Sequence, residues 1–179
     1  QASLATIRFT TKHLIGWLPT KSLLAKYDST LTPTCPFCPE RETTSHVWVC
    51  PAGVQWRRDF ILALRTQLLR SGTAPSLSRR IIQLIDNYYH DEVSTDTIDA
   101  RTLLVGLLPK SWLDAQDTHC RKNPDSTSGM AWAKRLIQFI WQATLDGWTD
   151  RCDEVHSNEQ NLQGELLAAA LRLARAPPP

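Results

Sequence analysis

Apolar residues recur every three or four positions along most of the chain, which is the period of an amphipathic helix. The alternation of apolar and polar residues that is typical of a strand is weak throughout. Proline, glycine and clusters of small polar residues separate the helical stretches. The predicted helices cover residues 3–19, 22–27, 44–50, 52–71, 77–89, 98–108, 111–120, 130–156 and 159–176. The pattern therefore predicts an all-α fold with many helices.

Some helix ends and faces can be assigned from single residues. Gly72 should stop the helix over 52–71, and Ser76 after Pro75 can cap the helix that follows. In the first helix the apolar positions approximate one face of the cylinder. These positions are Leu4, Ile7, Leu14, Ile15 and Leu18.

Length and composition are those of an ordinary globular protein, with 179 residues, 42% hydrophobic and 21% charged. We expect two parts, residues 1–51 and residues 52–179, packed as one unit. No run of 18 apolar residues occurs, so the sequence predicts no membrane span. The net charge of +2 is too small for nucleic-acid binding by bulk attraction, so any such binding must use a local patch. Seven tryptophans indicate a well-filled core.

Three of the five cysteines lie with a histidine in one short window, as Cys35-x2-Cys38-x7-His46-x3-Cys50. A Cys-x2-Cys turn presents two thiolates from one side, and His-x3-Cys places an imidazole and a thiolate one helical turn apart. A Cys3His set suits tetrahedral Zn²⁺, and four protein ligands leave no open position, so we predict a small knuckle that holds a structural zinc ion. The alternative is a chance cluster of buried thiols with a core histidine. An odd, clustered set of cysteines also favours a reducing, intracellular compartment (nuclear or cytoplasmic) over a disulfide framework.

Residues 16–51 resemble the zinc-binding region that follows the polymerase in non-LTR retrotransposon reverse transcriptases. Four elements carry the resemblance in the order seen in that family. They are WLPT at 17–20, CPFC at 35–38, Glu42-Thr43 before His46, and the closing Cys50-Pro51. A softer similarity to helical tails of such elements covers residues 128–156. Its matching positions are Trp148, Arg151 and His156, with Cys152 where asparagine is usual.

The resemblance implies a nucleic-acid-binding accessory domain that positions RNA template or target DNA near a polymerase of the same parent polyprotein. It does not imply catalysis, since the chain has no Tyr/Phe-x-Asp-Asp motif. Pro124-Asp125 matches the start of an endonuclease motif in some relatives, but no acidic residue follows at the right distance, and a turn explains it better. We therefore expect a protein that is not an enzyme.

Candidate nucleic-acid contacts are few. Lys12, Lys21 and Lys26 form one basic group, and a second one, Arg57-Arg58, begins the helix after the zinc ligands. A third pair is Arg79-Arg80. The alternative for each group is a solvated helix face. Trp48 could stack on a base, or it could fill the small core beneath the metal.

A second hypothesis is a helical protein–protein interaction module derived from a retroelement. The near-neutral charge and the many tryptophans favour it.

Overall fold

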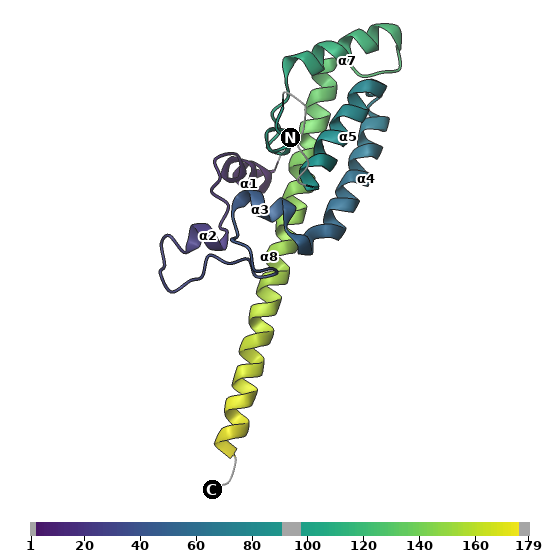
Figure 1. Ribbon diagram of the computed structural model, residues 1–179. Coiled ribbons are helices and arrows are strands. Elements are labelled where there is room, and N and C mark those ends of the chain that lie inside the picture. The colour runs from purple at the N-terminus through teal and green to yellow at the C-terminus, as the bar shows by residue number, and fades with distance from the viewer. Residues whose placement is uncertain (1–2, 91–97, 176–179) are drawn as a thin grey trace. The chain divides into compact units, whose positions relative to one another are not determined.

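The computed structural model describes residues 3–90 and 98–175 of the chain, and within them it contains eight α-helices, one short 3-10 helix and no strand (Figure 1). The all-α prediction is confirmed. The helices are α1 (Leu4–Leu14), α2 (Lys21–Leu24), α3 (Thr44–Val49), η1 (Pro51–Gly53), α4 (Val54–Arg70), α5 (Pro75–Tyr89), α6 (Ala100–Leu104), α7 (Lys110–Lys122) and α8 (Gly129–Arg175).

The chain divides into two units, Gln1–Leu145 and Asp146–Pro179. The boundary that we predicted between residues 51 and 52 lies inside the first unit. We call residues 3–53 the metal region and the remaining described residues of the first unit, 54–90 and 98–145, the bundle. The second unit holds residues 146–175 of α8 and contributes no residue to the sites discussed below.

Helix α5 is the centre of the bundle, because it packs against α4, α6 and α7 and also against α3 of the metal region. Helices α4 and α5 lie side by side, joined by a short turn (Figure 1). The buried stripe of α5 is Leu77, Ile81, Leu84 and Ile85. This spacing puts all four side chains on one face, so the apolar stripe of the sequence is the buried face of the helix.

The first part of α8 joins the bundle through large aromatic side chains. Trp132 is fully buried, and its indole N–H donates to Thr73 Oγ1 at 2.8 Å. Phe139 stacks on Phe60 of α4 with ring centroids 6.1 Å apart. Both contacts give a buried ring a specific partner, so they fix the position of this helix as well as burying apolar area.

Gln116 of α7 is completely buried and ties the loop ends of the bundle together. Its side-chain oxygen accepts from the amide of Ala74 at 2.9 Å. Its side-chain nitrogen donates to the carbonyls of Gly72 and Thr127 at 2.9 and 3.0 Å. Buried backbone groups that have no helical partner are thereby satisfied.

Several helix ends differ from the sequence prediction. Gly72 does stop α4, with a φ of +57° that favours glycine. The cap of α5 is Ala74 followed by Pro75 at the first helical position, so the prediction that Ser76 caps this helix was wrong. Helix α8 continues through residues 157–158, where we predicted a break, because no proline or glycine stands there to stop it.

Helix α1 turns the opposite face inward from the one its apolar stripe suggests. Its buried residues are Thr6, Phe9, Thr10 and His13. The apolar positions Leu4, Ile7, Leu14 and Ile15 are exposed. One of the two buried threonines has its hydroxyl satisfied within the helix, because Thr10 Oγ1 donates to the carbonyl of Thr6 at 2.7 Å.

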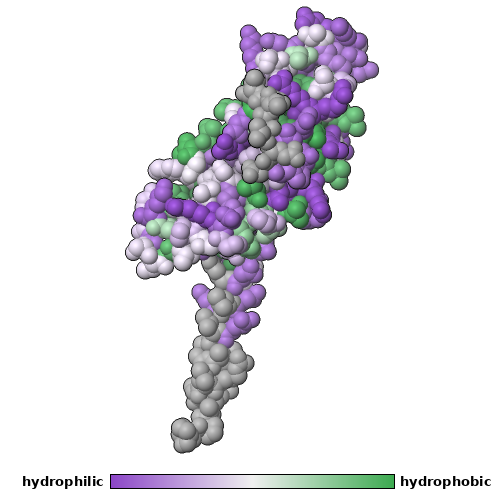
Figure 2. Space-filling model, in the orientation of Figure 1, coloured by the Kyte–Doolittle hydropathy of each residue, from purple (hydrophilic) through white to green (hydrophobic). Residues whose placement is uncertain are grey.

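The surface drawn in Figure 2 carries separate hydrophobic patches among hydrophilic residues. Of the helices described, none combines the length and the apolar character that crossing a bilayer requires.

Candidate metal centre

A short hairpin presents the first two cysteines. Thr34 and Arg41 form an isolated antiparallel bridge, and the amide of Cys35 donates to the carbonyl of Glu40 at 2.8 Å. The turn between them carries Cys38. A two-residue spacing on such a turn brings both thiols to one side of the hairpin, as the sequence pattern predicts.

The second ligand pair comes from α3 and its end. The side chain of Thr43 caps α3 by accepting from the amide of His46 at 3.1 Å. Cys50 follows the last helical residue and has an extended backbone, with φ of −51° and ψ of 130°. The chain therefore leaves the helix at Cys50, so His46 lies on the helix while Cys50 lies just beyond it.

The four side chains converge on one point. Their ligand atoms all lie within 4.8 Å of one another. Cys35 Sγ lies 3.7 Å from Cys50 Sγ, which lies 3.8 Å from Cys38 Sγ, while Cys38 Sγ lies 3.3 Å from His46 Nε2.

These separations are close to the edges of a tetrahedron around zinc. Metal–sulfur bonds of about 2.3 Å give sulfur–sulfur edges of about 3.8 Å, and a metal–nitrogen bond of about 2.0 Å gives sulfur–nitrogen edges of about 3.5 Å. The group thus fits a single tetrahedral ion, and its soft donors suit such a metal. The convergence that the sequence predicted is confirmed.

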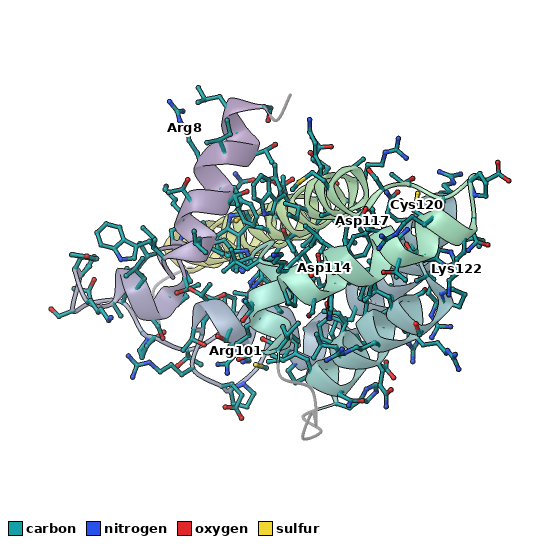
Figure 3. All side chains as sticks on the ribbon, turned by 90° about the horizontal axis from the view of Figure 1, so that it is seen from above. Arg8, Arg101, Asp114, Asp117, Cys120 and Lys122 are labelled. Atoms are coloured by element: carbon teal, nitrogen blue, oxygen red, sulfur yellow. The ribbon has the colours of Figure 1, made fainter. Side chains whose placement is uncertain are left out.

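Burial at the site disfavours the charged thiolate form of the cysteines when no metal is bound. Cys35 and Cys50 are buried, whereas Cys38 and His46 are half-buried. Burial is the main reason that the pKa of the Cys50 thiol rises to about 11, and the nearby Cys35 sulfur adds to the rise. The Cys50 thiol is therefore protonated at neutral pH without metal, and an ion must displace that proton in order to bind. No disulfide links the described cysteines, and Cys120 lies on α7 outside the group (Figure 3).

Three residues outside the ligand set hold it in place. The buried Glu42 accepts from the amide of Lys21 through a carboxylate oxygen, which places a negative charge at the start of α2. The amide of Phe37 donates to Cys35 Sγ at 3.5 Å. The Arg57 guanidinium donates to the carbonyl of Cys50 and lies 5.6 Å above the Tyr89 ring. Residues next to the ligands are thus anchored to α2 and to the bundle.

Trp48 lies on α3, between the ligands His46 and Cys50 in the sequence, and has only 3% of its surface exposed. Its indole N–H donates to Nε2 of His13 at 2.9 Å, and its ring lies 5.4 Å from that of Trp56. This burial and these ring contacts fit the alternative of a core role, and the stacking of Trp48 on nucleic acid stays a prediction.

His13 is the residue that sequence reasoning missed. Desolvation lowers its pKa to about 4, so the ring is neutral at physiological pH. Because Nε2 accepts from Trp48, the proton of the neutral ring lies on Nδ1. No spacing signal in the sequence links His13 to the metal ligands, since Trp48 connects them only in the folded chain.

The predicted basic residues do not form one cluster around the metal. Lys12, Lys26 and Arg58 are exposed, on or just after three different helices. Lys21 is half-buried at the start of α2, and Arg57 is engaged with Cys50 and Tyr89. The structure therefore assigns Arg57 to supporting the metal region.

Two exposed aromatic side chains lie among the N-terminal lysines. Trp17 is 60% exposed and Tyr27 is 77% exposed. Residues 1–27 contain four basic residues and no acidic residue, the first being Asp28. Arg8, one of the four, projects outward from α1 (Figure 3). We give the name basic aromatic surface to Lys12, Trp17, Lys21, Lys26 and Tyr27, which all lie within residues 12–27 of the chain.

No protein-family model, curated protein or solved structure matches the chain. The resemblance of residues 16–51 to a retrotransposon region therefore stays a prediction.

Proposed function

We propose that the chain is a zinc-stabilised helical module that binds single-stranded RNA or DNA and does not itself catalyse a reaction. In a retrotransposon-type protein of a reducing intracellular compartment, it would hold template RNA or target DNA for the polymerase of the same polyprotein. The observation that carries this proposal is the basic aromatic surface.

Zinc is favoured as the metal by the donor set and the geometry. Three thiolates and one imidazole at tetrahedral separations form a closed coordination sphere, which is typical of structural zinc. An ion held in this way fixes the hairpin and α3, and Glu42 connects the hairpin to α2. The metal would therefore act on binding indirectly, by ordering the elements that carry the basic aromatic surface.

Single strands are favoured over duplexes because the exposed groups are rings and isolated cations. Aromatic side chains stack on unstacked bases of any sequence, and lysines contact the phosphates between them. Trp17 and Tyr27 supply the rings, and Lys12 and Lys26 supply exposed charges. The lack of acidic residues in this stretch removes local repulsion of phosphate.

Fluorescence anisotropy with labelled single strands at rising salt tests the proposal. Each phosphate contact adds about 0.7 to the slope of log affinity against log salt, so Lys12→Ala/Lys26→Ala should reduce the slope by about 1.4. Trp17→Ala should weaken binding by about 1–3 kcal/mol and leave the slope unchanged. Arg65→Ala/Lys134→Ala is the matched control, because it removes two exposed charges elsewhere. Absence of binding at low salt, or equal effects of both double variants, would refute the proposal.

A second function is favoured by the exposed apolar stripe of α1. Leu4, Ile7 and Leu14 face solvent on a helix whose charged residues are all basic, which suits a partner protein with an acidic amphipathic surface. The polymerase part of the parent protein is the natural partner to test by co-elution. Leu4→Ser/Ile7→Ser should abolish co-elution and spare strand binding. Co-elution that survives this change would exclude the stripe as the contact.

A further inference from the structure

A cavity of about 340 Å³ opens where the end of α1, the start of α3 and helix α6 meet. Its apolar wall includes Leu14, Trp48, Leu104 and Leu107. The volume is at the small end of the range for ligand sites, which suits one planar ring system better than a larger molecule. We call it the α1–α6 cavity.

The cavity is lined by a ring whose hydrogen-bond donor has no partner within the described chain. His13 lines it and is only 6% exposed. Nε2 of this ring accepts from Trp48 at 2.9 Å, which leaves the proton on Nδ1. Nδ1 makes no hydrogen bond to any part of the described chain. An occupant with an acceptor at this point would give the N–H a direct partner and gain the free energy of one hydrogen bond.

The rim of the cavity favours a neutral occupant. Arg101 of α6, labelled in Figure 3, is the cation at the rim, and its Nη2 lies 2.6 Å from Asp99 Oδ2. The pair cancels its own charge, so the rim does not select an anion such as phosphate. The hydroxyls of Ser45 and Thr102 line the same space and can either donate or accept.

The cavity adjoins the basic aromatic surface. His13 and Leu14 line the cavity, and the neighbouring Lys12 belongs to that surface. Trp17 is held close to this helix end, because its amide donates to the carbonyl of Lys12 at 2.7 Å. A strand that contacts Lys12 and stacks on Trp17 therefore passes the mouth of the cavity.

We propose that the α1–α6 cavity accepts one unstacked base of a bound strand and selects uracil, thymine or guanine. The base edge that reaches deepest, away from the sugar, carries a carbonyl in these three bases and an amino group in cytosine and adenine. A carbonyl accepts the Nδ1 proton of His13, whereas an amino group would oppose one donor with another. This inference rests on the proposed function, because the base reaches the cavity as part of a bound strand.

The test compares the affinities of oligo-dT and oligo-dC of equal length by anisotropy. Stacking on Trp17 tolerates any base, so a thymine preference reports the cavity. We expect the wild-type chain to prefer oligo-dT by about fivefold to tenfold, the value of one hydrogen bond. Leu107→Trp should fill the mouth of the cavity and remove the preference. Leu62→Trp, which adds the same bulk to an exposed position on α4, should retain it.

The two proposals fail in different ways. If the wild-type chain binds neither strand, the proposed function is wrong and the cavity proposal falls with it. If it binds both strands equally, or if Leu107→Trp keeps the thymine preference, only the cavity proposal is overturned. Ser45→Phe blocks the cavity from the α3 side, so it replaces Leu107→Trp if circular dichroism shows that the latter is misfolded.

Discussion

Helices α1 and α5 are both amphipathic, yet they turn opposite faces to the interior. Helix α5 buries its apolar stripe, from Leu77 to Ile85, against three other helices of the bundle. Helix α1 buries two threonines and a histidine along with Phe9, while its leucines face solvent. In the bundle, burial of apolar area decides which face turns inward. In the metal region, the more polar face of α1 turns inward, and His13 on this face contacts Trp48.

The two regions also differ in what stabilises them. The bundle has long helices with fully buried side chains such as Leu64 and Ile81. The metal region has short helices and a hairpin with a single isolated bridge, which bury too little to be stable alone. We therefore expect the metal to supply the stability of residues 3–53 and packing to supply that of the bundle.

The largest predicted effect is a loss of stability in the metal region that leaves the bundle unchanged. Cys50→Ser removes one of four ligands and should remove metal binding, which contributes on the order of 10 kcal/mol in such sites. By hydrogen exchange, amides of α2, α3 and the hairpin should lose protection, while those of α5 keep it. Cys120→Ser, outside the ligand group, is the control and should change neither region. Equal protection of α3 in the wild type and in Cys50→Ser would contradict this division.

The reverse experiment targets the bundle. Leu64→Ala should lower the free energy of unfolding of the bundle by about 2–5 kcal/mol, because it leaves a cavity at a completely buried position. The loss should be the same with and without zinc in urea denaturation. Leu62→Ala, at an exposed position two residues away, should have little effect. A loss for Leu64→Ala that depends on zinc would mean that the regions are coupled.

A third prediction concerns the pH dependence of the contact that joins α1 to the metal region. Burial lowers the folded-state pKa of His13 from 6.5 to about 4, so the unfolded chain binds the extra proton between these values. The stability that depends on neutral His13 is fully present above pH 6.5. As the pH falls from 6.5 to 4, the free energy of unfolding should decrease by up to about 3 kcal/mol.

Stability curves for wild type and His13→Gln should diverge across that window. Glutamine can still accept from Trp48, but it does not titrate, so the variant should lose less stability in acid. The exposed His90→Gln serves as the control for removing a histidine, and it should follow the wild type. Parallel curves for wild type and His13→Gln would disprove the assignment.

The smallest predicted effect lies at the loop ends of the bundle. Gln116→Leu should cost about 2 kcal/mol, because it leaves the Ala74 amide and two carbonyls without their partner. The loss should appear in thermal unfolding of the bundle and should leave zinc content unchanged. Gln55→Leu, at an exposed position, is the matched control. Loss of zinc in Gln116→Leu would show that this network reaches the metal region.

The sequence predicted some of these features because their causes are local. Ligand spacing is covalent, so the convergence of Cys35, Cys38, His46 and Cys50 could be inferred before the fold was known. The stripe of α5 was equally clear, since helical period and apolar burial agree there.

Other features depend on contacts between distant segments, and the sequence could not reveal them. The inward face of α1 depends on Trp48, which lies 35 positions after His13. The role of Arg57 depends on Tyr89, which comes close only when α4 and α5 pair. The first case overrides the rule that apolar stripes turn inward. The second overrides the rule that arginines at helix starts are available to bind phosphate.

X-ray absorption at the zinc edge on the purified chain tests the central claim most directly. We predict one zinc ion per chain, with three sulfur neighbours at about 2.3 Å and one nitrogen neighbour at about 2.0–2.1 Å. A chain that holds no stoichiometric zinc, or zinc surrounded mainly by oxygen, would contradict it.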